Sequence, residues 1–140
     1  MRKLYVIALL LPLLTFSQAK NVSQTDFLFT SAPIFPGCEE FYNSEKEKIK
    51  CFAEKLQQHI ANNFQYPKLA LRMKIQGIVY VNFIIDIDGS IKGIQTKGPH
   101  PLLEKEAARI VSLLPGIVPA RNGDEFVKVP FSIPITFRLD

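Results

Sequence analysis

The last stretch of the chain, VPFSIPITFRL at residues 129–139, restricts the fold more than any other segment. Its apolar residues alternate as in a β-strand and share one face: Val129, Phe131, Ile133, Ile135, Phe137 and Leu139. Pro130 and Pro134 lie on the other face, and proline has no N–H to donate to a neighbouring strand. Residues of the same parity direct their main-chain groups toward the same side of a strand, so both missing donors face one side. We therefore predict that this strand lies at the edge of a sheet, with its proline side free.

Residues 78–98 predict a β-hairpin that pairs antiparallel. Its first strand carries alternating apolar residues on one face, namely Val79, Val81, Phe83, Ile85 and Ile87. Asp88-Gly89 is typical of a tight hairpin turn, and SIKGIQ returns as the second strand. Between this hairpin and the last strand, the residues VPARNGDEF predict a loop.

Three helices are expected. Ser44 and Glu47 predict the start of the first helix as a capping box, and an apolar stripe follows at helical spacing: Ile49, Phe52, Ala53, Leu56 and Ile60. His59 at the margin of this stripe indicates an interfacial side chain. Residues 65–77 predict a short helix with Pro67 at its first position, whose Lys68 and Arg72 form a solvated face. Residues 100–116 predict a third helix, whose apolar side holds Leu103, Ala107, Ile110, Val111 and Leu114.

These elements predict an α+β domain with one three-stranded sheet, antiparallel or mixed, and with helices packed on one face. A right-handed crossover places the last strand parallel to the second. If the last strand pairs with the first, the strand order is 2-1-3 and the last strand is an edge.

The amino-terminal residues 1–19 resemble a signal peptide. A basic opening, MRK, precedes the apolar run at residues 4–16, and SQA places small residues at a cleavage site. The competing interpretation is a permanent membrane anchor, but a helix of this run reaches only about 20 Å against a hydrocarbon core of roughly 30 Å. We expect residues 20–44 to be an extended lead-in and residues 45–140 to form the domain.

Cys38 and Cys51 are the two cysteines of the chain. Export to an oxidising compartment favours a disulfide between them, and two buried free thiols are the alternative. Two cysteines with two distant histidines make a poor zinc site, so we predict neither a metal nor any other cofactor.

Composition and motifs indicate no catalytic chemistry. Without the first residues the net charge is about +2, which is too small to indicate binding of nucleic acid. We interpret Asp86, Asp88, Glu104 and Glu106 as solvated surface groups, and no nucleophile, phosphate-binding or dinucleotide motif is present. The candidate functional feature is the free strand edge, which proteins either protect or use for strand addition. Its prolines are a protective device, so both interpretations remain open at this point.

Several segments together resemble the C-terminal domain of TonB, the energy transducer of Gram-negative bacteria. The resemblance covers roughly residues 64–140 and depends on markers that occur in order along the chain. These are Tyr66-Pro67, Gly77 before the alternating strand, Asp88-Gly89, Glu106-Ala107 and Ile133-Pro134-Ile135. FPGCE at residues 35–39 and Cys51-Phe52 resemble the lead-in of a secreted branch of this family.

The resemblance implies a periplasmic binding module that is not an enzyme. Domains of this family bind the Ton box, an extended peptide of outer-membrane receptors, beside their last strand during energy-coupled transport. Carried over by position, the peptide-binding residues are Gln65, Tyr66, Pro67, Phe131, Ser132, Ile133, Ile135, Thr136, Phe137 and Arg138. Other TonB-system components, or a second copy of the chain, are further possible partners.

Two departures from the family pattern are expected to matter. Only about two dozen residues separate the predicted signal peptide from the first predicted helix, so we expect a freestanding domain without the long linker of a complete transducer. Pro130 and Pro134 also leave fewer donors, so a short added peptide is feasible and a long continuous ladder is not. The alternatives are an envelope scaffold that dimerises, and an anchored transducer whose signal sequence stays uncleaved.

Overall fold

A computed structural model of the chain describes residues 29–41 and 43–140. The predicted signal peptide and the first part of the lead-in lie outside these residues. The described elements are η2 (Glu39–Phe41), α1 (Glu45–Asn63), α2 (Lys68–Arg72), β1 (Gly77–Ile85), β2 (Ile91–Lys97), α3 (Pro101–Ser112), β3 (Ala120–Asn122), β4 (Glu125–Val127) and β5 (Val129–Phe137). None of the helices within the described ranges has the length and apolar character that a membrane span requires.

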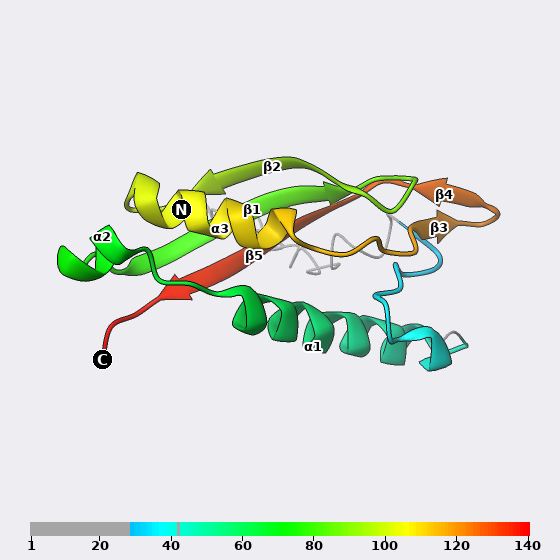
Figure 1. Ribbon diagram of the computed structural model, residues 1–140. Helices are drawn as coiled ribbons and strands as arrows, with labels where there is room; N and C mark the ends of the chain where they lie inside the picture. The colour runs from blue at the N-terminus through cyan, green and yellow to red at the C-terminus, as the bar shows by residue number, and fades with distance from the viewer. Residues whose placement is uncertain (1–28, 42) are drawn as a thin grey trace, which may run out of the picture.

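The main sheet has the strand order β2-β1-β5, and both of its strand pairs are antiparallel (Figure 1). This confirms the predicted order, with the last strand of the chain beside the first strand of the hairpin. The ladder between β1 and β5 is continuous over nine residue pairs, from Gly77–Phe137 to Ile85–Val129. The ladder between β1 and β2 contains a bulge after Asn82, opposite Gly93, whose φ of 63° suits glycine.

The helices pack on one face of the sheet, as predicted. Alternate residues of β1 are fully buried, and they form the core with side chains of α3 and β5: Val79, Val81, Phe83, Ile85, Leu103, Ile110, Ile133, Ile135 and Phe137. Polar contacts join α1 to α3. His59 Nε2 lies 2.8 Å from the carbonyl oxygen of Ile110, and Arg109 donates to the carbonyl of Asn63. His59 is therefore the interfacial residue that the sequence indicated.

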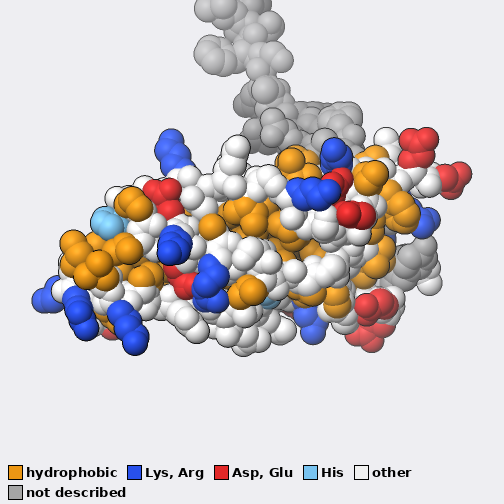
Figure 2. Space-filling view, turned by 45° about the horizontal axis from the view of Figure 1, so that its top comes forward, with side chains coloured by type: hydrophobic (Ala, Val, Ile, Leu, Met, Phe, Trp, Pro, Cys, Tyr) orange, Lys and Arg blue, Asp and Glu red, His pale blue; other side chains and the backbone are white. Residues whose placement is uncertain are grey.

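Local signals explain where the helices begin. Ser44 Oγ accepts the N–H of Glu47 at 3.4 Å, as the capping pattern predicts, and His100 Nδ1 accepts the N–H of Leu102 at 3.1 Å. Helix α2 is shorter than predicted and starts after Pro67, which is its N-cap. Apolar side chains gather with lysine and arginine at the end of the molecule where α2 lies (Figure 2), and Lys68 and Arg72 are exposed as expected.

The predicted loop before the last strand is wrong, because these residues form a second hairpin of β3 and β4. Its two-residue turn is Gly123-Asp124, with φ of 65° at the glycine, and Gly-Asp is one of the dipeptides that such hairpin turns favour. Bridges between Ser31 and Arg121, and between Ile34 and Val118, attach this part of the chain to the lead-in.

Two of the four carboxylates that we interpreted as solvated are buried. Asp86 lies 2.9 Å from the ammonium of Lys92, and this hydrogen-bonded partner holds the pKa of Asp86 below its ordinary value. Glu106 is buried beside Arg109, one turn along α3. The prediction that both carboxylates are exposed was wrong, because an apolar pattern does not show which cationic side chain will lie beside a carboxylate. Ile87 was also misplaced, since it lies in the hairpin turn and 52% of it is exposed.

The described residues of the lead-in include the short helix η2 and pack against the domain. Its described residues include five that are buried, namely Ala32, Pro33, Ile34, Phe35 and Cys38. Its backbone exchanges two hydrogen bonds between Ile34 and Val118, at 2.9 and 3.0 Å. The lead-in therefore forms part of the core and positions one end of the site described below.

Two glycines with similar backbones allow a test of the hairpin turn. Gly89 and Gly123 have φ of 81° and 65°, but a Cβ at Gly89 would meet the carbonyl oxygen of Ile117 at 1.9 Å, whereas a Cβ at Gly123 meets nothing within 4 Å. We predict that Gly123→Ala costs about 1 kcal/mol in the free energy of unfolding, from left-handed strain alone. Gly89→Ala should cost at least twice as much. Urea unfolding of both variants measures the difference, and equal losses would contradict the close contact.

Candidate peptide-binding edge

The outer side of β5 is an open edge among the described strands, because β1 alone pairs with it in the sheet. The ladder with β1 is continuous although Pro130 and Pro134 cannot donate, so the prolines must direct their main-chain groups away from β1. The N–H of Leu139 supports this parity, because it donates to Gln76 Oε1 at 2.6 Å, and Gln76 immediately precedes β1. Odd-numbered residues therefore bond toward β1, and even-numbered residues face the free edge.

The free edge offers more acceptors than donors. Its N–H groups within β5 are those of Ser132 and Thr136, which are four residues apart. Its carbonyl groups are those of Pro130, Ser132, Pro134 and Thr136. A strand added here can donate to every outward carbonyl but can accept from only two N–H groups, so the edge is limited rather than closed.

The structure divides the predicted binding residues of β5 into two groups. Ser132, Thr136 and Arg138 are exposed and lie on the free side of the strand. Ile133, Ile135 and Phe137 are buried, and their main-chain groups face β1. This second group holds the strand in place and presents little surface to a ligand. Phe131 is intermediate, since its main chain faces β1 while its half-buried ring reaches a pocket.

The predicted residues Gln65–Pro67 lie at the carboxyl end of β5. The Tyr66 and Phe64 rings are 5.8 and 5.1 Å from the Phe137 ring, and the Tyr66 hydroxyl donates to the carbonyl of Ile75. Gln65 is exposed between these two aromatic residues. The structure thus places Gln65–Pro67 near Phe137, whereas Phe131 and Ser132 lie toward the amino end of the strand.

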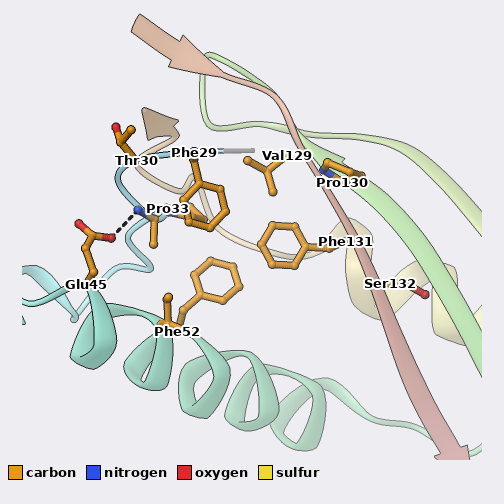
Figure 3. Close-up of a pocket in the computed structure, with 11 residues that line it drawn as sticks. Phe29, Thr30, Pro33, Glu45, Phe52, Val129, Pro130, Phe131 and Ser132 are labelled. Carbon is orange, nitrogen blue, oxygen red and sulfur yellow. Dashed lines mark hydrogen bonds between the residues drawn. The ribbon is translucent and has the colours of Figure 1, made fainter. Parts of the chain in front are cut away.

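A pocket of about 470 Å³, which we call the edge pocket, opens at the amino end of β5 (Figure 3). It is lined by the lead-in, by the first half of α1 and by β5: Phe29, Thr30, Ala32, Pro33, Glu45, Ile49, Phe52, Val129, Pro130, Phe131 and Ser132. The sequence analysis missed this pocket because it placed Ile49 in the apolar stripe that faces the core. In the structure 52% of Ile49 is exposed, and the sequence pattern held no signal for this exposure.

Stacked rings make the floor of the edge pocket continuous with the core. The Phe131 ring lies 5.3 Å from the Phe52 ring and 5.5 Å from the Phe83 ring, nearly parallel to both. Phe35 meets Phe52 edge-on at 5.6 Å. Because these rings contact one another within a packed interior, the floor is held in one conformation.

Polar contacts fix the lead-in wall of the edge pocket. Glu45 accepts the N–H of Ala32 at 2.8 Å and pairs with Lys48, whose ammonium donates to Ser31 Oγ at 2.9 Å. Lys48 is only 1% exposed, so its charge depends on these partners. Burial raises the pKa of the Glu45 carboxyl, but the hydrogen bonds from Lys48 and Ala32 outweigh it and hold this pKa below its ordinary value.

A disulfide joins the lead-in to α1 behind this wall. Cys38 and Cys51 are bonded, with their Cα atoms 5.9 Å apart, and both residues are buried. The predicted pairing is therefore present. No group of three or more histidine, cysteine, aspartate or glutamate residues that could hold a metal occurs within the described ranges.

The fold and the edge define a small α+β domain whose carboxyl-terminal strand is open for pairing. The chain belongs to the TonB C-terminal family, because the family model described as Gram-negative bacterial TonB protein C-terminal matches residues 62–139.

The chain is also similar to the solution structure of a Helicobacter pylori TonB-CTD. Sequence identity is 25%, the match covers 75% of this chain and 94% of that one, and the TM-score is 0.53. A shorter form of the same Helicobacter pylori domain shows 30% identity over 62% of this chain and 92% of its own length, with a TM-score of 0.45. No curated protein matches the sequence.

Removal of the disulfide should loosen the lead-in. The bond closes a loop with a sequence separation of 13 residues, so we predict that the double change Cys38→Ser and Cys51→Ser lowers the free energy of unfolding by about 2–4 kcal/mol. Urea unfolding of the variant and of the parent measures this loss. The parent in strong reductant is the matched control, and it should lose about the same amount. A variant as stable as the oxidised parent would contradict a structural role for the bond.

Proposed function

We propose that this domain captures a short extended peptide by strand addition at the free edge of β5. The ligand is the Ton box of outer-membrane receptors, and the setting is energy-coupled nutrient transport across the envelope. The domain contributes binding without enzymatic chemistry. Membership of the TonB C-terminal family supports this function, because the matched region, residues 62–139, contains the whole of β5.

One observation carries the proposal: outward main-chain groups remain without a strand partner on β5 among the described residues. An extended peptide gains its affinity from such groups, and its side chains supply the specificity. The N–H groups of Ser132 and Thr136 fix the register of the peptide because they are the two outward donors within β5. Gln65, Tyr66 and Pro67 lie at the carboxyl end of the same edge, where they meet the peptide as it leaves the strand.

A second copy of the chain is the alternative occupant of this edge. Self-pairing of two β5 strands would bring two prolines from each side, so donors would be missing on both strands. A receptor peptide without proline lacks none of its own donors, and the edge therefore favours a peptide over a second copy. Sedimentation velocity distinguishes the two, since scaffolding by self-association requires a dimer at micromolar protein.

The periplasmic location is part of the proposal and depends on residues 1–19. We predict that the exported protein begins at Lys20, because the small residues of SQA suit a signal peptidase. Intact mass spectrometry of the protein from the envelope fraction decides this point. A mass that retains the first nineteen residues would instead indicate the anchored transducer.

The outward donors allow a direct test of strand capture. Thr136→Pro removes one outward N–H and leaves the pairing with β1 intact, because Pro130 and Pro134 already occupy equivalent positions. We predict about fivefold weaker binding of Ton-box peptides, which corresponds to one hydrogen bond of about 1 kcal/mol. Pro134→Ala adds a donor and should strengthen binding by a similar factor. NMR titration of labelled protein with Ton-box peptides from receptors of the same cell measures both.

Thr136→Val is the matched control, because it removes the hydroxyl and keeps the N–H, so its affinity should equal that of the parent. Chemical-shift changes should lie along β5 and at residues 65–67. Absence of shifts with every peptide would contradict strand capture and would favour the scaffold.

A further inference from the structure

We propose that the edge pocket is a subsite for one large apolar side chain of the captured peptide. This inference rests on the proposed function, because it assumes that an extended peptide lies along β5. The subsite would require a large apolar residue at one position of the peptide, and the main-chain hydrogen bonds of the edge cannot impose such a requirement.

The parity of β5 directs one peptide side chain into the pocket. In a sheet, residues that lie opposite each other on neighbouring strands point to the same face. The side chain of Ser132 is exposed on the face away from the helices, so the peptide residue opposite Ser132 also points away from them. Its neighbour, opposite Phe131, points toward the helix layer. There it meets the opening between Phe131 and α1, which is the edge pocket.

The lining of the pocket selects an apolar side chain. Phe29, Pro33, Phe52 and Phe131 present carbon surfaces to the opening (Figure 3). Ile49 also lines the pocket. Glu45 is the one charged residue among the described residues of the lining, and its carboxylate already accepts the N–H of Ala32 and pairs with Lys48. A charged peptide side chain would therefore lose water without gaining a free partner, whereas a leucine, isoleucine or phenylalanine would cover the exposed part of Ile49.

The lead-in also fixes where the paired segment stops. Phe29 and Pro33 line the pocket together with Val129, the first residue of β5 (Figure 3), so an added strand meets this wall after it passes Phe131. The apolar residue is therefore at the end of the paired segment. From there, the next peptide residue lies opposite Ser132, and the residue four positions further lies opposite Thr136. The required pattern is one apolar residue at a fixed distance from both outward donors.

The experiment is a double-mutant cycle on the mature protein, read by fluorescence anisotropy with ten-residue labelled peptides from the Ton-box segments of receptors of the same cell. Ile49→Gln makes the pocket wall polar without adding a charge, and it should weaken binding about tenfold. Alanine substitution along the peptide should find one apolar position with a similar loss. The two losses should not add, because both remove the same contact.

Ile87→Gln is the matched control, because Ile87 is the same residue type, has the same exposed fraction of 52% and lies in the β1–β2 turn outside the pocket lining. It should bind like the parent. Circular dichroism checks the fold of both variants, and the peptide substitutions leave the protein unchanged in any case.

The outcomes separate the two proposals. Non-additive losses at Ile49 and at one apolar peptide position support the subsite. Peptides that shift β5 but tolerate both Ile49→Gln and every alanine substitution overturn the subsite and leave strand capture standing. Failure of all peptides to bind overturns strand capture, and the subsite with it.

Discussion

The ladder between β1 and β5 is the interaction on which the rest of the structure depends. Nine continuous pairs fix the parity of the last strand, and parity decides which side chains enter the core and which main-chain groups face outward. A slip by one residue would turn Phe131 away from the helices and would direct Pro130 and Pro134 at β1, where their missing N–H groups would break the ladder. Packing and hydrogen bonding therefore select the same register, and the open edge is a consequence of it.

An open edge is a hazard as well as a site, because unpaired main-chain groups attract any exposed strand. In this domain the prolines reduce the number of outward donors without removing an outward carbonyl. When two such edges pair, N–H donors are missing from both strands. When a proline-free peptide is added, donors are missing from β5 alone. The same two residues therefore discourage self-pairing and still permit capture of a short peptide.

The elements and the edge position of the last strand could be predicted from local patterns, whereas the disulfide was predicted from the cysteine pair and the expected export of the chain. Alternation, the two prolines, the Asp88-Gly89 turn and the capping residue Ser44 each act over a few residues. The edge pocket could not be predicted, because Ile49 belongs to an apolar stripe whose exposure depends on where the lead-in crosses α1. The burial of Glu106 and Asp86 could not be predicted for a related reason, since burial of a carboxylate depends on where its cationic partner lies in the fold. The β3–β4 hairpin is different, because its turn signal, Gly123-Asp124, is present in the sequence.

The lead-in makes the two ends of the β5 edge different, because it closes the amino end. Without it, β5 would be a ladder open at both ends, and an added strand could slide by two residues while keeping most of its carbonyl contacts. The disulfide and the contacts of Glu45, Lys48 and Ser31 place a wall at the amino end of the strand. Such a wall fixes the register of an added strand along β5. A fixed register places one particular peptide side chain at the edge pocket. In the proposed mode of binding, selectivity among peptides depends on residues outside the sheet, in the segment that precedes the first helix.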